Sequence, residues 1–264
     1  PAGVYDAMAL TQWRWTLLFF NTDNMSAIYL LFALWFLSTA AFTIGFFTRA
    51  ANFAVWLLTM SFINRNLSLP GFADEVLQSA LFWLLLSPCG ASLSIDAWRA
   101  RRRTSKSDAA DDHEPLVPAW PVRLLQLQLC VIYVATGILK LAKLSDPTWR
   151  NGTAVHYALS FPYGRRSFAE LPLPLWLTAP ATFVVLLFEL GFPVFMCVKK
   201  LRRWTLLSGV ALHLLIWATL DVGWFGLYTI AFYCMWLPDA WAQRLRRAPR
   251  LLVEWGRVLF RESE

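Results

Sequence analysis

Four ionisable residues interrupt otherwise apolar stretches of the chain. Lys140 lies near the end of QLQLCVIYVATGILKLAK, and Glu189 interrupts VVLLFELGFPV. His213 interrupts GVALHLLIW, and Arg65 lies in SFINRNLSLP. A charged or titratable group within hydrocarbon costs several kcal/mol unless it is paired. Each of these positions is therefore a candidate for a functional site if the stretches cross a membrane.

Lys140 has two interpretations. At about 1.5 Å per residue it lies roughly 25 Å along its segment, near the outer boundary, where a long amine can reach headgroups or water at little cost. Alternatively, Thr136 and Gly137, one turn earlier, are small enough to let a neighbouring helix or a flat ligand approach closely. The second interpretation suits a cavity better than a lipid-facing surface.

The other three residues also have alternative roles. By the same rise per residue, Glu189 and His213 come out near the bilayer midplane, on neighbouring segments joined by a short loop, so they could meet. They would form either a structural polar contact between helices or a proton relay. Arg65, between Asn64 and Asn66, would be an outer-surface anchor, a loop clamp or a catalyst.

The composition indicates that lipid is the main solvent of the chain. Of its 264 residues, 58% are hydrophobic and only 16% are charged, whereas a soluble domain would keep about a quarter charged. The net charge is +7, but the basic residues stand in short blocks beside apolar segments, as topology signals do. We therefore expect a single membrane domain over 1–264, with the lipid bilayer as a partner and without nucleic-acid binding.

The cysteines and the linker histidine do not indicate a metal site. Cys89, Cys130, Cys197 and Cys234 are far apart, lie in or beside apolar segments and have no CxxC or Cys/His spacing. We expect them to be buried packing residues. His113 lies among acidic residues of a polar linker, without a second ligand at metal-site spacing. Neither a metal nor thiol redox chemistry is expected.

Apolar segments long enough to cross a bilayer predict an all-α fold, a polytopic transmembrane helix bundle with about seven spans. The stretch MALTQWRWTLLFF, within 1–21, predicts an interfacial N-terminal helix. A basic and polar linker at 99–119 and a basic tail at 239–264 complete the chain. The expected spans are 25–47, 51–67, 75–93, 122–143, 176–198, 204–220 and 223–238.

Three basic blocks predict the orientation of these spans. WRARRRTSK, KKLRR and RLRRAPR follow the third, fifth and seventh segments, and such blocks stay on the cytoplasmic side. Arg49 and the C-terminus would then be cytoplasmic, and 64–74, 144–175 and Asp221 would lie outside. Because the chain starts with Pro rather than Met, we expect either a trimmed initiator or an upstream segment missing from the sequence.

Three longer segments carry a family resemblance, through their order, their spacing and the landmarks Arg65, Asp74, Lys140, Trp149, Gly152 and His213. They are INRNLSLPGFADEVLQSALFWLLLSPCGASLSID at 63–96, LLQLQLCVIYVATGILKLAKLSDPTWRNGTAVHYAL at 124–159 and GVALHLLIWATLDVGWFGLYTIAFYCMWLP at 209–238. Together they resemble the horizontally transferred transmembrane (HTTM) domain family, bacterial relatives of the membrane domain of the vitamin K-dependent gamma-carboxylase. The resemblance covers most of the chain and implies the bacterial cytoplasmic membrane.

The resemblance implies a chemistry for two residues. The lysine in the carboxylase segment resembling GILKL is understood to deprotonate reduced vitamin K, and it corresponds to Lys140. The histidine in the segment resembling ALHLLIW corresponds to His213 and would stabilise developing negative charge. A lysine held in an apolar pocket can act as a neutral base towards a hydroquinone hydroxyl. The residues that would line a site for a reduced quinone are Arg65, Asn66, Trp149, Gly152 and Glu189.

Three departures limit what the resemblance implies. Leu139 precedes Lys140 where the carboxylase has paired lysines, and Asn66 stands where it has a histidine. The large lumenal domain that binds the protein substrate is absent, so carboxylation of protein glutamates is not expected.

Three functions remain open. The first is an enzyme acting on a quinol or another lipid-soluble small molecule, with Lys140 as base. The second is a non-catalytic subunit that packs helices, lipid or pigment in a larger membrane complex, which 15 Trp and 20 Phe would suit. The third is a transporter or toxin-immunity protein, since Glu189 could carry protons. Convergence of Lys140, His213 and Glu189 on one cavity would favour the enzyme.

Overall fold

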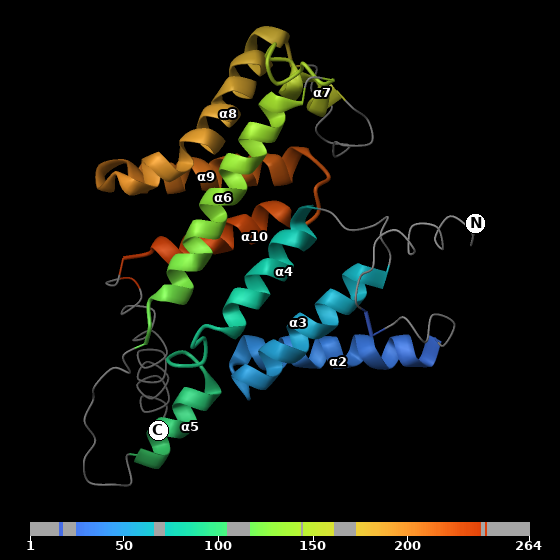
Figure 1. Cartoon of the computed structure of the whole chain (residues 1–264), viewed down its shortest axis with the longest axis vertical. Coiled ribbons are helices and arrows are strands. Elements are labelled where there is room, and N and C mark those ends of the chain that lie inside the picture. Colours follow the sequence, from blue (N-terminus) through green and yellow to red (C-terminus); the bar gives the residue numbers. More distant parts are fainter. Residues whose placement is uncertain are drawn as a thin grey trace, which may run out of the picture. The chain divides into compact units, whose positions relative to one another are not determined.

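The structure is a computed structural model, and its regular elements are all helices (Figure 1). The all-α fold is therefore confirmed for the part of the chain that the structure describes. Contacts divide the chain into two compact units, residues 1–121 with 237–264 and residues 122–236. The described residues are 16–17, 25–65, 72–104, 117–143, 145–160, 173–238 and 241.

The described part of the first unit contains four helices, in which α2 packs on α3 and α3 packs on α4. Helix α2 is apolar along its whole length and has no buried residue. A helix that is apolar all round and keeps most of its surface uncovered by protein is suited to lipid contact. The helices are α2 (Met25–Ile44), α3 (Thr48–Arg65), α4 (Phe72–Leu85) and α5 (Ile95–Thr104).

The turn between α2 and α3 is held by a residue of α5. The carboxylate of Asp96 accepts hydrogen bonds from the backbone N–H of Phe47 (3.1 Å) and from the N–H and hydroxyl of Thr48 (2.7 and 2.8 Å). The first N–H groups of a helix have no partner inside it, so Asp96 acts as a cap for α3. Gly45, with φ of 69°, lets the turn approach Ser94 more closely than any side chain would allow.

The Asp96 cap predicts an acid-sensitive contribution to stability. Hydrogen bonds from the backbone and hydroxyl of Thr48 hold the pKa of Asp96 below its usual 3.8. Because this pKa is lower in the folded chain than in the unfolded one, the contribution is complete above about pH 4 and is lost as the pH falls through the lowered pKa. We expect Asp96→Ala to lower the Tm at pH 7 and to flatten the fall of Tm below pH 4, measured by thermal unfolding in detergent. Asp221→Ala, at an exposed carboxylate, is the control, and an unchanged acid profile in Asp96→Ala would contradict the cap.

Two boundaries in this unit differ from those expected. Helix α4 ends at Leu85, although the apolar segment continues towards residue 93. Pro88 has no backbone N–H to continue the helix, and residues 86–94 form turns instead. The expected linker at 99–119 begins inside α5, whose first turn is capped by the Ser94 hydroxyl through the N–H of Ala97 (2.9 Å).

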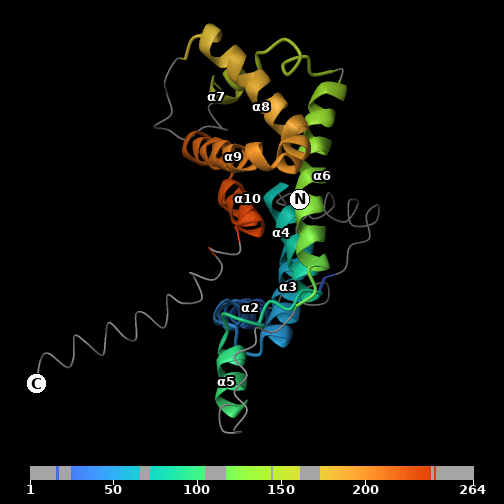
Figure 2. The ribbon, with the colours of Figure 1, turned by 90° about the vertical axis from the view of Figure 1, so that its left-hand side faces the viewer.

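In the second unit α8 contacts α7 and α9, and α9 contacts α10. Helices α9 and α10 lie side by side and run across α6 rather than along it (Figures 1 and 2). The elements are α6 (Trp120–Ala142), α7 (Ala154–Ser160), α8 (Leu175–Cys197), α9 (Lys199–Thr219), α10 (Phe225–Phe232) and the 3₁₀ turn η2 (Tyr233–Trp236).

Among the described helices of both units, α2, α6 and α8 are long and apolar enough to cross a membrane. The other four expected spans coincide with α3, α4, α9 and α10, which are shorter or more polar, so seven spans remain a prediction.

The interfacial helix expected in 1–21 and the tail at 239–264 lie almost entirely outside the described residues, and His113 lies outside them. The expected burial of the cysteines is wrong for Cys89, Cys197 and Cys234, which are exposed, while Cys130 is half-buried.

Candidate functional site

Helices α6 and α8 bring Lys140 and Glu189 together. The ammonium Nζ of Lys140 lies 2.5 Å from Oε1 of Glu189. Gly137, one turn before Lys140, makes this approach possible, since a Cβ there would lie 2.8 Å from Leu190 Cδ2 and 3.4 Å from Glu189 Cβ. Helix α8 is therefore the neighbouring helix that approaches closely at Gly137. The ion pair compensates both charges within the apolar surroundings.

Trp149 also contacts the amine of Lys140. Its ring centroid lies 4.2 Å from Lys140 Nζ, a cation–π contact. The loop that carries Trp149 is shaped by Asp146, whose carboxylate accepts hydrogen bonds from the backbone N–H (3.1 Å) and hydroxyl (2.6 Å) of Thr148. These bonds also hold the pKa of Asp146 below its usual value. The loop is thus ordered by its own polar residues, and it presents the indole to Lys140.

Gly152 fixes the end of this loop on α8. Its carbonyl accepts a hydrogen bond from the hydroxyl of Thr182 (3.0 Å), a fully buried residue of α8. Its φ of 82° is a backbone conformation that favours glycine, and a Cβ there would lie 2.9 Å from the ring of Phe183. Gly152 therefore acts here through the backbone, by holding the loop of Trp149 against α8.

The ion pair lies at the edge of the unit and not in its centre. The side chain of Lys140 is 24% exposed and that of Glu189 is 11% exposed. Ile138 and Leu139, beside Lys140, are apolar and largely exposed. A molecule that reaches this amine would therefore approach over an apolar surface, which favours a lipid-soluble one.

A second polar cluster lies in the aromatic core. His213 Nε2 is 2.6 Å from the hydroxyl of Tyr133, which is 2.5 Å from the hydroxyl of Tyr233. All three residues are at most 5% exposed, and Phe188 and Phe192 pack around Tyr133. The cluster joins α6, α9 and η2 by hydrogen bonds inside an apolar environment, where such bonds fix geometry strongly.

Glycines make room for this cluster. A Cβ at Gly209 would overlap the hydroxyl of Tyr233, and a Cβ at Gly226 would lie 2.7 Å from the carbonyl oxygen of His213. These two glycines let η2 and α10 approach α9 closely enough for the cluster to form.

The hydrogen atoms of the cluster have a preferred arrangement. If Tyr133 donates to His213 Nε2, Tyr233 can donate to the Tyr133 oxygen, and both hydroxyl hydrogens are used. In the reverse direction the Tyr233 hydrogen would have no acceptor among the described residues. The first arrangement leaves fewer buried groups unpaired and places the proton of a neutral His213 on Nδ1.

The two clusters share helices α6 and α8. Phe188, the neighbour of Glu189 on α8, packs its ring against Tyr133. On α6, Lys140 follows Tyr133 by seven residues and hence lies on the same face. Two buried atoms of these clusters, Glu189 Oε2 and His213 Nδ1, have no hydrogen-bond partner among the described residues.

Five of the seven candidate residues lie in the second unit: Lys140, Glu189, Trp149 and Gly152 at or beside the ion pair, and His213 in the aromatic cluster. Their similar depth suggested a direct contact between Glu189 and His213. Instead, Glu189 contacts Lys140, and His213 contacts Tyr133. Arg65 is the last residue of α3, in the first unit, and its side chain lies outside the described part, as does Asn66.

Tyr133 and Tyr233 are not among the residues predicted from the sequence. A tyrosine within an apolar segment is the signal that could have found them, because a buried phenol usually needs a hydrogen-bond partner.

Apolar helices of spanning length and a polar site at the edge of one helical unit define a helical membrane protein. The model of the HTTM domain matches residues 11–241, which is most of the chain, so the chain belongs to the HTTM domain family. The resemblance carried by the segments at 63–96, 124–159 and 209–238 is confirmed. Comparisons with curated proteins and with solved structures gave no match.

Proposed function

We propose that the chain is a membrane enzyme that removes a proton from a hydroxyl group of a lipid-soluble small molecule of the hydroquinone class. Lys140 is the base. The observation that carries the proposal is the pair of Lys140 with Glu189 at the apolar edge of the second unit, with Trp149 against the amine. A fully buried structural pair would be unreachable, whereas this amine is partly exposed.

Glu189 gives the proton of Lys140 a place to go. Transfer of one proton from Nζ to Oε1 along their hydrogen bond leaves a neutral amine and a neutral carboxylic acid. The amine then takes the hydroxyl proton of the bound molecule and becomes an ammonium again, beside the oxygen anion that it has produced. The net charge of the site stays constant throughout, so no uncompensated charge is created in an apolar environment.

The residues present fit a reduced quinone. Such a molecule has a flat ring and hydroxyl groups that both donate and accept hydrogen bonds, and it supplies a weakly acidic proton. The indole of Trp149 offers a ring face. Glu189 Oε2 and His213 Nδ1 have no partners among the described residues. After a local rearrangement, Oε2 could accept a hydrogen bond from a hydroxyl group and Nδ1 could donate one to a hydroxyl oxygen.

His213 would hold developing negative charge through its Nδ1 hydrogen. Tyr133 and Tyr233 fix the ring and its tautomer by occupying Nε2. In this proposal His213 stabilises charge, and the two tyrosines are positioning residues.

The proposed topology is seven spans in the bacterial cytoplasmic membrane, with the C-terminus in the cytoplasm. Each expected apolar segment overlaps a described helix, and the basic block of α5 follows the third segment. Lys/Arg-rich segments beside spans are retained on the cytoplasmic side.

The test uses the full chain in lipid nanodiscs, without oxygen, and 1,4-naphthohydroquinone as the probe. We expect the absorbance band of the hydroquinone anion to appear on binding at pH 7, where the free probe is neutral, because Lys140 holds its proton. Binding without the anion band would overturn the base and favour the alternative, a non-catalytic subunit that packs lipid, pigment or other membrane proteins.

A further inference from the structure

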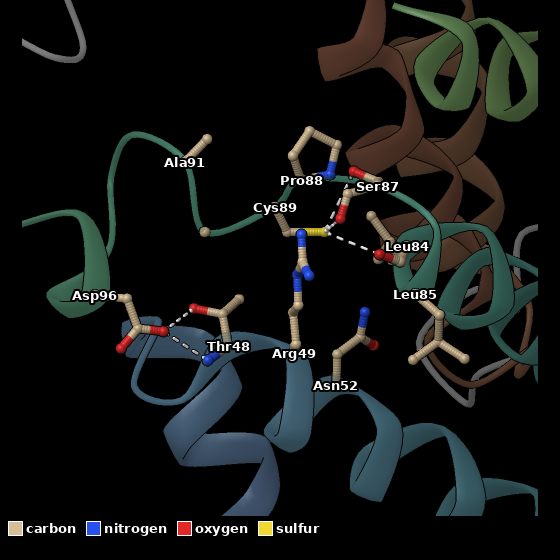
Figure 3. A pocket seen from close by; sticks show the side chains of 11 residues that line it. Thr48, Arg49, Asn52, Leu84, Leu85, Ser87, Pro88, Cys89, Ala91 and Asp96 are labelled. Atoms are coloured by element: carbon tan, nitrogen blue, oxygen red, sulfur yellow. Dashed lines mark hydrogen bonds between the residues drawn. The ribbon is translucent and has the colours of Figure 1, made fainter. Parts of the chain in front are cut away.

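The first unit contains a pocket of about 300 Å³ between the start of α3 and the turns that join α4 to α5 (Figure 3). Gly90 brings these turns onto α3, since a Cβ there would lie 2.6 Å from the hydroxyl oxygen of Thr48. The polar side chains that line the pocket come from Thr48, Arg49, Asn52, Ser87, Cys89 and Asp96.

Asn52 is a buried polar residue that points into this pocket (Figure 3). Asn52 is only 2% exposed, and its side-chain oxygen Oδ1 has no hydrogen-bond partner among the described residues. A buried amide oxygen without a partner is costly unless a ligand or a water donates a hydrogen bond to it, as a hydroxyl of a phosphate ester can. The amide nitrogen is directed towards the open space of the pocket, where it can donate hydrogen bonds (Figure 3).

Arg49 projects from α3 into the same space, one turn before Asn52 (Figure 3). The described part of the chain supplies no ion pair or hydrogen bond to its guanidinium. The carboxylate in the lining, Asp96, is directed at Thr48 and already accepts three hydrogen bonds as the cap of α3. Arg49 is therefore a positive charge that no described group neutralises.

We propose that this pocket binds the phosphate group of a phosphate ester or of inorganic phosphate. The planar guanidinium of Arg49 offers the paired N–H donors that match phosphate oxygens, and the amide nitrogen of Asn52 and the hydroxyl of Ser87 add further donors. The volume suits a small headgroup. Helix α5, with Trp98 and a block of arginines, borders the pocket through Asp96, and this composition is typical of a helix at a lipid headgroup surface.

Cys89 provides the reporter, because its exposed thiol lines the pocket. The full chain in detergent is alkylated with a maleimide, and the rate at each cysteine is read by peptide mass spectrometry. Inorganic phosphate, glycerol 3-phosphate and micelles containing phosphatidylglycerol are added separately, with chloride at the same ionic strength as reference. We expect a phosphate-bearing probe to slow alkylation of Cys89 and to leave the exposed Cys197 and Cys234 unchanged.

Arg49→Gln is expected to raise the Kd for that probe at least about tenfold, since hydrogen bonds to charged groups are lost. Arg103→Gln, which removes the same charge from an exposed position of α5 outside the lining, should leave the Kd unchanged. If Arg49→Gln does not fold, Arg49→Lys keeps the charge but lacks the paired N–H donors of the guanidinium, so it should still weaken binding of the probe.

Protection by phosphatidylglycerol alone would identify a lipid headgroup, and protection by all three probes would include soluble phosphates; both results support the site. Absence of protection with every probe would overturn it, as would equal protection in Arg49→Gln. The outcome does not depend on Lys140, so it is separate from the proposed acid–base function.

Discussion

Lys140→Arg is expected to reduce formation of the bound hydroquinone anion by about 10²- to 10⁴-fold, the range that a positioned general base contributes. Arginine keeps the positive charge and can still pair with Glu189, but it does not lose its proton in proteins and cannot act as a base. The absorbance of the anion in nanodiscs at pH 7 measures the effect. A structural ion pair would tolerate the change, so this substitution separates chemistry from packing.

The matched control is Lys143→Arg, an exposed lysine just beyond the end of α6. Its anion band and its Tm should both equal those of the unchanged chain. Lys140→Met should also abolish the band, and it should lower stability as well, because Glu189 would keep a mostly buried carboxylate without its partner. A full anion band in Lys140→Arg would remove Lys140 as the base, whatever happens to Lys140→Met.

The positions of the helices could be predicted from the sequence because each apolar segment must satisfy its own backbone in a bilayer. The segments at 122–143 and 176–198 match α6 and α8 to within about two residues. The end of α4 was missed because hydropathy runs on past Leu85, while the missing N–H of Pro88 decides where the helix stops. The crossing of α9 and α10 over α6 depends on contacts between helices, which periodicity within one segment does not contain.

The candidate site could be predicted in its members but not in its pairing. Lys140, Glu189 and His213 stand out because each is ionisable within an apolar segment. Counting residues from the cytoplasmic ends placed Lys140 near the outer boundary and Glu189 near the midplane, which would keep them apart. That count assumes straight helices parallel to the membrane normal. The contact between Lys140 and Glu189 depends instead on the relative shift of α6 and α8 along their axes, where they approach closely at Gly137. The sequence contains the glycine but not the relative shift of the two helices.

Tyr133→Phe is expected to lower the free energy of unfolding by about 1–3 kcal/mol, because the substitution leaves the buried His213 Nε2 and the Tyr233 hydroxyl without their common partner. The aromatic packing against Phe192 is kept, so the loss reports the hydrogen bonds and not a cavity. Unfolding in mixed micelles with increasing SDS measures it.

Tyr157→Phe is the control, since this tyrosine is 60% exposed and its substitution should change the free energy of unfolding little. If Tyr133 also positions His213 for the proposed chemistry, Tyr133→Phe should weaken the hydroquinone anion band even at temperatures where the chain stays folded. Loss of stability without any change in that band would leave Tyr133 a structural role only. Unchanged stability would mean that water or another group replaces the phenol, and the hydrogen-bond cluster would then not hold α6, α9 and η2 together.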